Sequence, residues 1–133
     1  IVFLGWAFKK DTNDTRESAA IYIADKLIEE QAQIHVYDPK VSFERMKEDL
    51  HYLQSRPDEE NNRHLHFETD PYEAVVGAHA VAIITEWDEF KTYDWQKIYD
   101  KMKKPAFIFD GRNILHKKEM ETIGFEFTGI GKR

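Results

Sequence analysis

The 133-residue sequence contains no cysteine, which excludes disulfides, thiolate metal sites and cysteine nucleophiles. It also has few residues that break regular structure, with six glycines and four prolines, whereas nine Phe, six Tyr and three Trp are present. A chain with this much apolar surface to bury is expected to be globular and not disordered. Because its length is close to the commonest domain size, we predict one domain over residues 1–133.

Two further absences limit the partners of the chain. No run approaches the roughly 20 apolar residues that a membrane-spanning helix needs, and 25 acidic residues outnumber 19 basic ones to give a net charge of -6. Neither a membrane nor a nucleic acid is therefore an expected partner, since a net anion repels a polyanion, and we expect a cytoplasmic protein. The sequence starts with Ile1 inside an apolar run and lacks an initiator methionine, so we expect a fragment of a longer chain.

Short apolar runs that are rich in β-branched and aromatic residues recur along the chain and predict buried strands. These runs are residues 1–4, 34–37, 80–85, 106–109 and 125–128. A sixth run, 64–67, alternates polar and apolar residues and is predicted to be an edge strand. The polar stretch 54–64 is predicted to be a surface loop.

Amphipathic segments alternate with these runs and predict helices. The first has apolar residues at helical spacing, namely Ala20, Ile23, Ala24, Leu27 and Ile28. Asp14 followed by Glu17 has the spacing of a capping box, so this helix is predicted to begin near Thr15. Asp70 before Pro71 places an acceptor at the cap of a second helix and a proline at its first position. The apolar stripe of that helix is Tyr72, Val75 and Val76.

Two more helical segments complete the pattern. Thr85 with Asp88 is predicted to cap one of them, and residues 94–102 form the other before Pro105 ends it. Alternation of strands and helices predicts right-handed crossovers and a parallel arrangement. The expected fold is α/β, with a doubly wound, mostly parallel, Rossmann-like sheet that has helices on both faces.

Three cations follow the predicted strands, at the edge where a doubly wound sheet binds its ligands. Lys9 follows the first strand, Arg16 opens the helix after it, and Arg112 follows the strand at 106–109. We expect the three side chains to converge and to bind a phosphate or pyrophosphate. The alternative is that each cation pairs with a neighbouring carboxylate. The carboxylates close to Lys9 and Arg16 are Asp11, Asp14 and Glu17.

The turn after the first strand fits a dinucleotide site only in part. Gly5 follows the strand, and Asp38 ends the next one, where an acid would hold a ribose. The GxGxxG pattern fails because Ala7 and Lys10 stand where it requires its second and third glycines. Asp38 before Pro39 is therefore interpreted as a turn residue.

Two other clusters give weak signals for chemistry. His64 and His66 would share one face of a strand, but two ligands are too few for a zinc site and no third stands at a recognisable spacing, so we predict no metal. Glu86, Asp88 and Glu89 are interpreted as cap and solvated-face residues and not as a general base. We predict no catalytic residue in the chain.

Six segments spread over the whole chain resemble the carboxyl-terminal, UDP-binding domain of the UDP-glucose/GDP-mannose dehydrogenase family. They read GWAFKKDTNDTRES at 5–18, VYDPK at 36–40, DPYEA at 70–74, TEWDEF at 85–90, KPAFIFDGR at 104–112 and IGF at 123–125. The KKDT and TEW motifs are closest to the UDP-glucose group. Trp6 stands where the family usually has phenylalanine, and Asn13 where glycine is common, which a left-handed asparagine can tolerate.

The resemblance implies a part of an enzyme that oxidises UDP-glucose to UDP-glucuronate with two molecules of NAD⁺, through a cysteine outside this chain. It implies an amino-terminal NAD domain, a central helical region and a homo-oligomeric full-length enzyme, so the chain alone would be inactive. By position, Phe8, Lys9 and Arg112 would contact the UDP-sugar, and Arg16 would reach the NAD. The alternative is an isolated nucleotide-binding or oligomerisation module without catalysis.

Overall fold

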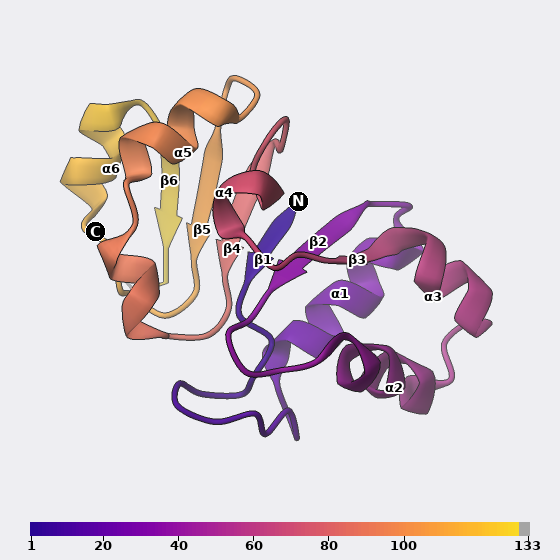
Figure 1. Ribbon diagram of the computed structural model, residues 1–133. Coiled ribbons are helices and arrows are strands. Elements are labelled where there is room, and N and C mark those ends of the chain that lie inside the picture. Colours follow the sequence, from indigo (N-terminus) through magenta and orange to yellow (C-terminus); the bar gives the residue numbers. More distant parts are fainter. Residues whose placement is uncertain (131–133) are drawn as a thin grey trace.

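The computed structural model describes residues 1–130, which form one sheet of six parallel strands (Figure 1). The strands are β1 (Val2–Leu4), β2 (Ile34–Tyr37), β3 (Leu65–Phe67), β4 (Ala80–Ile83), β5 (Phe107–Asp110) and β6 (Glu126–Gly129). Their order is β3-β2-β1-β4-β5-β6. The chain moves outward from β1 to β3, returns to the centre and moves outward again, which is the doubly wound order. The predicted fold class is confirmed, and β3 lies at an edge as predicted.

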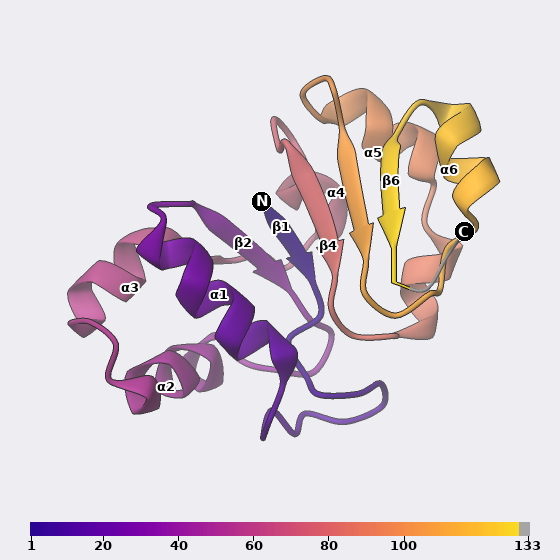
Figure 2. The ribbon, with the colours of Figure 1, turned by 180° about the vertical axis from the view of Figure 1, so that it is seen from behind.

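Helices lie on both faces of the sheet (Figures 1 and 2). They are α1 (Ala19–Glu29), α2 (Phe43–Leu53), α3 (Asp58–His64), α4 (Pro71–Ala74), α5 (Trp95–Lys101) and α6 (Lys117–Ile123), with the 3-10 helix η1 (Asp88–Thr92) before α5. Side chains alternate along β1, so Val2 and Leu4 enter the core on the side of α4, α5 and α6, whereas Phe3 enters the core on the side of α1. None of these helices has the length and apolar content needed to cross a membrane.

The first helix begins later than predicted. α1 starts two residues after Glu17, whose left-handed backbone (φ 60°) cannot be part of the helix. Ser18 is the N-cap: its hydroxyl accepts a hydrogen bond from the amide of Ala20 (3.2 Å) and donates one to the carbonyl of Trp6 (2.6 Å). The predicted capping box of Asp14 and Glu17 is therefore wrong, because Glu17 lies outside the helix and Ser18, whose hydroxyl also binds the Trp6 carbonyl, occupies the cap position.

The surface loop predicted at 54–64 is also wrong. Residues Asp58–His64 form α3, and only 9% of the Arg56 side chain before it is exposed. The Arg56 guanidinium donates to the carboxylate of Asp25 at 2.8 Å and to the side-chain oxygen of Asn61 at 2.9 Å. Internal hydrogen bonds satisfy these polar groups, so the polar composition of the segment did not make it a solvated loop.

Of the other predicted helix starts, two are confirmed. The side chain of Asp70 accepts from a first-turn amide of α4 at 2.9 Å, and that of Asp94 accepts from a first-turn amide of α5 at 3.1 Å. Thr85 does not cap the next segment, since η1 has no side-chain cap. Val75 is buried as predicted, but Val76 is 57% exposed because α4 is a single turn.

Candidate functional site

The loop between β1 and α1, residues 5–18, lies at the carboxyl edge of the sheet and closes on itself; we call it the β1–α1 loop. The amide of Phe8 donates to the carbonyl of Asp14 at 2.9 Å, and the hydroxyl of Ser18 donates to the carbonyl of Trp6 at 2.6 Å. These two bonds join the early part of the loop to its late part. Three of the four predicted site residues lie in this loop.

The buried carboxylate of Asp38, which follows β2, binds the start of the β1–α1 loop. One oxygen accepts from the amides of Trp6 (2.8 Å) and Ala7 (3.0 Å). The other accepts from the amides of Lys40 (2.8 Å) and Val41 (3.1 Å), so the predicted turn role is confirmed. The first pair adds a second role, because it anchors the loop to β2. Both oxygens are occupied by main-chain amides, so Asp38 does not resemble the free acid that holds a ribose in a dinucleotide site.

Thr85, which follows β4, also binds the main chain of the β1–α1 loop. Its buried hydroxyl donates to the carbonyl of Ala7 at 2.6 Å. The backbone of Gly5 passes directly against the Thr85 side chain with a φ of 102°, and a Cβ at Gly5 would overlap that side chain. Gly5 is therefore required both for the close approach and for the positive φ.

We expect Gly5→Ala to destabilise the protein by about 3 kcal/mol, because the new methyl group meets Thr85 and alanine is strained at positive φ. Gly77→Ala is the matched control. Gly77 also has a positive φ (72°), but an added Cβ there meets no atom within 4 Å, so we expect a loss of about 1 kcal/mol from backbone strain alone. Chemical denaturation measures both losses, and equal values would contradict the steric role of Thr85.

Arg112, which follows β5, reaches across the sheet edge to the β1–α1 loop. Its guanidinium donates to the carbonyl of Phe8 (2.7 Å) and to the carbonyl of Ile84 (2.8 Å). It also faces the carboxylate of Glu86 at 3.4 Å. The carboxylate of Asp110 fixes the main chain at this point by accepting from the amide of Arg112 at 3.0 Å. Three of the five guanidinium N–H groups thus have partners within residues 1–130, and two remain.

Lys9 directly follows Phe8, whose carbonyl Arg112 binds. Its side chain is exposed, with Nζ 5.4 Å from the centre of the Phe8 ring, and it forms no ion pair with a carboxylate in the described part of the chain. The neighbouring Lys10 differs, since its amide donates to Glu86 at 2.9 Å and its ammonium pairs with an acid of η1 at 3.4 Å. The structure thus brings Arg112 to the main chain beside Lys9, but it also pairs Arg112 with Glu86. The predicted convergence of the cations on a phosphate stays a prediction.

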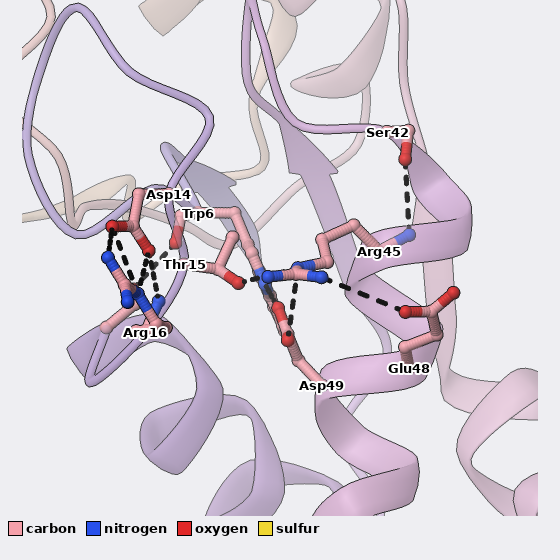
Figure 3. A network of polar contacts seen from close by, with 9 residues as sticks. Trp6, Asp14, Thr15, Arg16, Ser42, Arg45, Glu48 and Asp49 are labelled. Atoms are coloured by element: carbon pink, nitrogen blue, oxygen red, sulfur yellow. Dashed lines mark hydrogen bonds and ion pairs between the residues drawn. The ribbon is translucent and has the colours of Figure 1, made fainter.

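Arg16 has different contacts from the other two cations (Figure 3). Its guanidinium binds the carboxylate of Asp14 at 2.7 Å, and 82% of its side chain is exposed. The hydrogen bonds from Arg16 lower the pKa of Asp14 to about 2, and the same pairing raises the pKa of Arg16. Arg16 lines a surface pocket of about 810 Å³ with Arg45 of α2, which neither Lys9 nor Arg112 lines. For Arg16 the structure thus shows the alternative, a pair with a neighbouring carboxylate.

Comparison with known proteins decides the family of the chain. Residues 2–117 match the UDP binding domain of the UDP-glucose/GDP-mannose dehydrogenase family. The chain belongs to this family. The resemblance seen in its motifs is thereby confirmed.

Curated dehydrogenases of the family match the chain over its whole length. It is 52% identical over 135 residues to UDP-glucose 6-dehydrogenase of Pongo abelii and 47% identical over 141 residues to UDP-glucose 6-dehydrogenase 4 of Arabidopsis thaliana. These alignments cover 100% and 99% of the chain but only 27% and 29% of the relatives. The chain therefore spans little more than a quarter of the length of the dehydrogenases that it matches.

Solved structures of dehydrogenases share the fold. An NDP-N-acetyl-D-galactosaminuronic acid dehydrogenase from Methanosarcina mazei Go1 superposes with a TM-score of 0.76 at 25% identity, over 99% of this chain and 24% of that one. A UDP-glucose dehydrogenase from Pyrobaculum islandicum superposes with a TM-score of 0.60 at 25% identity, over 90% of this chain and 22% of that one. Both overlaps are again confined to about a quarter of the longer protein.

In this dehydrogenase domain, the acidic residues after β4 bind other side chains. The carboxylate of Glu89 accepts from the phenol groups of Tyr37 (2.8 Å) and Tyr93 (2.6 Å). Burial, followed by the Glu89 carboxylate, raises the pKa of Tyr37 to about 12 and also raises the pKa of Tyr93. The interpretation of Glu86 and Glu89 as solvated-face residues is therefore wrong, whereas Asp88 is exposed at the start of η1 as predicted.

Two histidines on neighbouring strands, His35 of β2 and His66 of β3, contact each other and further polar side chains. His35 and His66 stack with ring centres 4.6 Å apart, while His35 binds Glu68 at 2.7 Å and His66 binds Gln33 at 2.6 Å. Desolvation, followed by the charge of His35, lowers the pKa of His66. His64 ends α3 instead of lying in a strand, so the predicted shared strand face with His66 is wrong. Residues 1–130 contain no group of three or more histidines and carboxylates that could hold a metal ion.

Proposed function

We propose that this chain is the UDP-sugar binding part of a UDP-glucose 6-dehydrogenase, which oxidises UDP-glucose to UDP-glucuronate with two molecules of NAD⁺. The identity of 47–52% to such enzymes supports the proposal. The observation that carries it is the contact of Arg112 with the Phe8 carbonyl, beside Lys9, which forms no ion pair within residues 1–130. The oxidation itself takes place on parts of the enzyme outside this chain, because the chain has no cysteine to form the covalent intermediates.

The three proposed substrate residues suit a nucleoside diphosphate. Arg112 offers two N–H groups from a rigid fork that is already held in place, which matches the geometry of phosphate oxygens. Lys9 adds an ammonium that can follow the phosphate as a point charge. Phe8, which directly precedes Lys9, is half-buried and adds apolar contact with the UDP-sugar. Fixed donors lose little entropy when a ligand binds, so most of their interaction energy contributes to affinity.

The rest of the enzyme belongs to the same proposal. Arg16 reaches an NAD that is bound mainly by the amino-terminal domain, and its exposed guanidinium, oriented by Asp14, supports this role. Residues 1–133 act as one domain of a cytoplasmic, homo-oligomeric full-length dehydrogenase. The partners of the domain are UDP-glucose and the remaining dehydrogenase chain.

Turnover measurements test this assignment. We expect the 133-residue chain to show no NAD-dependent oxidation of UDP-glucose, because no residue in it replaces the thiol. The full-length protein is expected to form NADH when UDP-glucose is added, which absorbance records. Turnover by the 133-residue chain alone would contradict the proposal. A full-length protein that binds UDP without oxidising UDP-glucose would favour the other candidate, a nucleotide-binding or oligomerisation module.

A further inference from the structure

One turn of α2 contacts the β1–α1 loop near both of its ends (Figure 3). The indole N–H of Trp6 donates to the carboxylate of Asp49 at 2.9 Å. Nε of Arg45 donates to the hydroxyl of Thr15 at 3.1 Å and lies 3.7 Å from the other oxygen of Asp49. Arg45 and Asp49 are four residues apart and therefore share one face of α2. This pair connects residues 6 and 15 of the loop through a helix that is not part of it.

The residues that make these contacts are mostly buried, and hydrogen bonds between buried groups contribute most to holding a conformation. Trp6 is fully buried and Thr15 is 1% exposed, and only 11% of the Asp49 side chain is exposed. The stretch between them, which includes Lys9, Lys10 and Asp11, is largely exposed and packs little apolar surface. Its conformation therefore depends on its polar attachments more than on burial.

We propose that Arg45 and Asp49 are positioning residues for the UDP-sugar site, which hold the β1–α1 loop in the conformation that presents Phe8 and Lys9 to the ligand. This inference rests on the proposed function. If the competent conformation is only partly populated, the apparent affinity falls by the same fraction. The indole of Trp6 supplies the attachment to Asp49, because a phenylalanine at this position has no N–H to donate.

The test uses the full-length enzyme with the variants Trp6→Phe and Arg45→Gln, each of which removes one attachment of the loop. We expect each to raise the KM for UDP-glucose and the Kd for UDP roughly two- to tenfold, the effect of one hydrogen bond. We expect kcat to change less than about twofold, because the variants do not touch reacting atoms. Amide hydrogen exchange within residues 6–18 should become faster in both variants.

Arg56→Gln is the matched control, because it breaks the Arg56 contacts with Asp25 and Asn61 and leaves the β1–α1 loop untouched. It should lower the melting temperature without raising the KM for UDP-glucose. If Trp6→Phe and Arg45→Gln behave in the same way as Arg56→Gln, with the KM and the loop exchange unchanged, the pair is only structural and the inference is overturned.

Two substrate-site variants separate this inference from the proposed function. If Lys9→Ala and Arg112→Ala weaken UDP binding but Trp6→Phe and Arg45→Gln do not, only the positioning role is overturned. If Lys9→Ala and Arg112→Ala leave UDP binding unchanged, the proposed function and the positioning role are both overturned. Weaker UDP binding in all four variants, with unchanged binding in the Arg56→Gln control, supports both.

Discussion

Asp38→Ala is expected to destabilise the protein by about 3–5 kcal/mol, one of the largest losses from a single substitution in this chain. The substitution removes the acceptor for the amides of Trp6 and Ala7, which lie in the buried start of the β1–α1 loop. Each unsatisfied amide costs roughly 1–3 kcal/mol. The free energy of unfolding, measured by chemical denaturation, gives the loss directly.

Asp100→Ala is the control for this prediction. Asp100 accepts a hydrogen bond from the exposed side chain of Gln96 on α5, so its removal should change the free energy of unfolding by less than about 0.5 kcal/mol. The loss of free energy of unfolding for Asp38→Asn should fall between those for Asp38→Ala and Asp100→Ala, because one side-chain oxygen still accepts from main-chain amides. If Asp38→Ala is as mild as Asp100→Ala, Asp38 is not the anchor of the loop.

Arg112→Ala is expected to weaken the binding of UDP to the full-length enzyme roughly 10- to 100-fold, the usual effect of hydrogen bonds to a charged group. The loss has two causes, since the substitution removes the two available N–H groups and also the bond to the Phe8 carbonyl. Lys9→Ala removes an exposed charge and should weaken binding only about three- to tenfold. Titration calorimetry with UDP measures both effects.

Two variants test whether UDP affinity depends on the bidentate geometry of the Arg112 guanidinium or only on its positive charge. Arg112→Lys retains the positive charge but loses the bidentate geometry, so most of the loss seen with alanine should remain. Arg63→Ala removes an exposed arginine of α3, away from the sheet edge, and should leave the affinity unchanged. An Arg63→Ala loss equal to that of Arg112→Ala would mean that UDP responds to net charge and not to this site.

Local sequence patterns were sufficient to predict the strands of the sheet. Each predicted strand is present, because runs such as 34–37 and 80–85 have too many β-branched residues for a loop and too few residues for a helix. The predicted cap at Asp70 is confirmed, since a cap bonds to amides two or three residues away, and the predicted helix at 94–102 is present as α5. Two helices, α2 and α6, had no predicted counterpart, and α3 was mistaken for a loop because all seven of its residues are polar.

The candidate site was predictable only in part. Lys9 and Arg112 could be selected because parallel strands place their carboxyl ends at one edge, which is a consequence of topology. The same argument also selected Arg16, whose partner is Asp14 two residues earlier. Thr85 and the Arg45–Asp49 pair were missed, since no local motif marks a hydroxyl or an ion pair whose partner lies elsewhere in the chain.

The sequence by itself determined the doubly wound fold, the family and the two cations beside the proposed UDP site, because hydrophobic periodicity and motif spacing are properties of neighbouring residues. Only the tertiary structure decided how the β1–α1 loop is held. Asp38 meets Trp6 across 32 residues, Arg45 meets Thr15 across 30, and Thr85 meets Ala7 across 78. Such partners are chosen by which buried donors and acceptors the packed sheet brings together, and each must be satisfied once water is excluded.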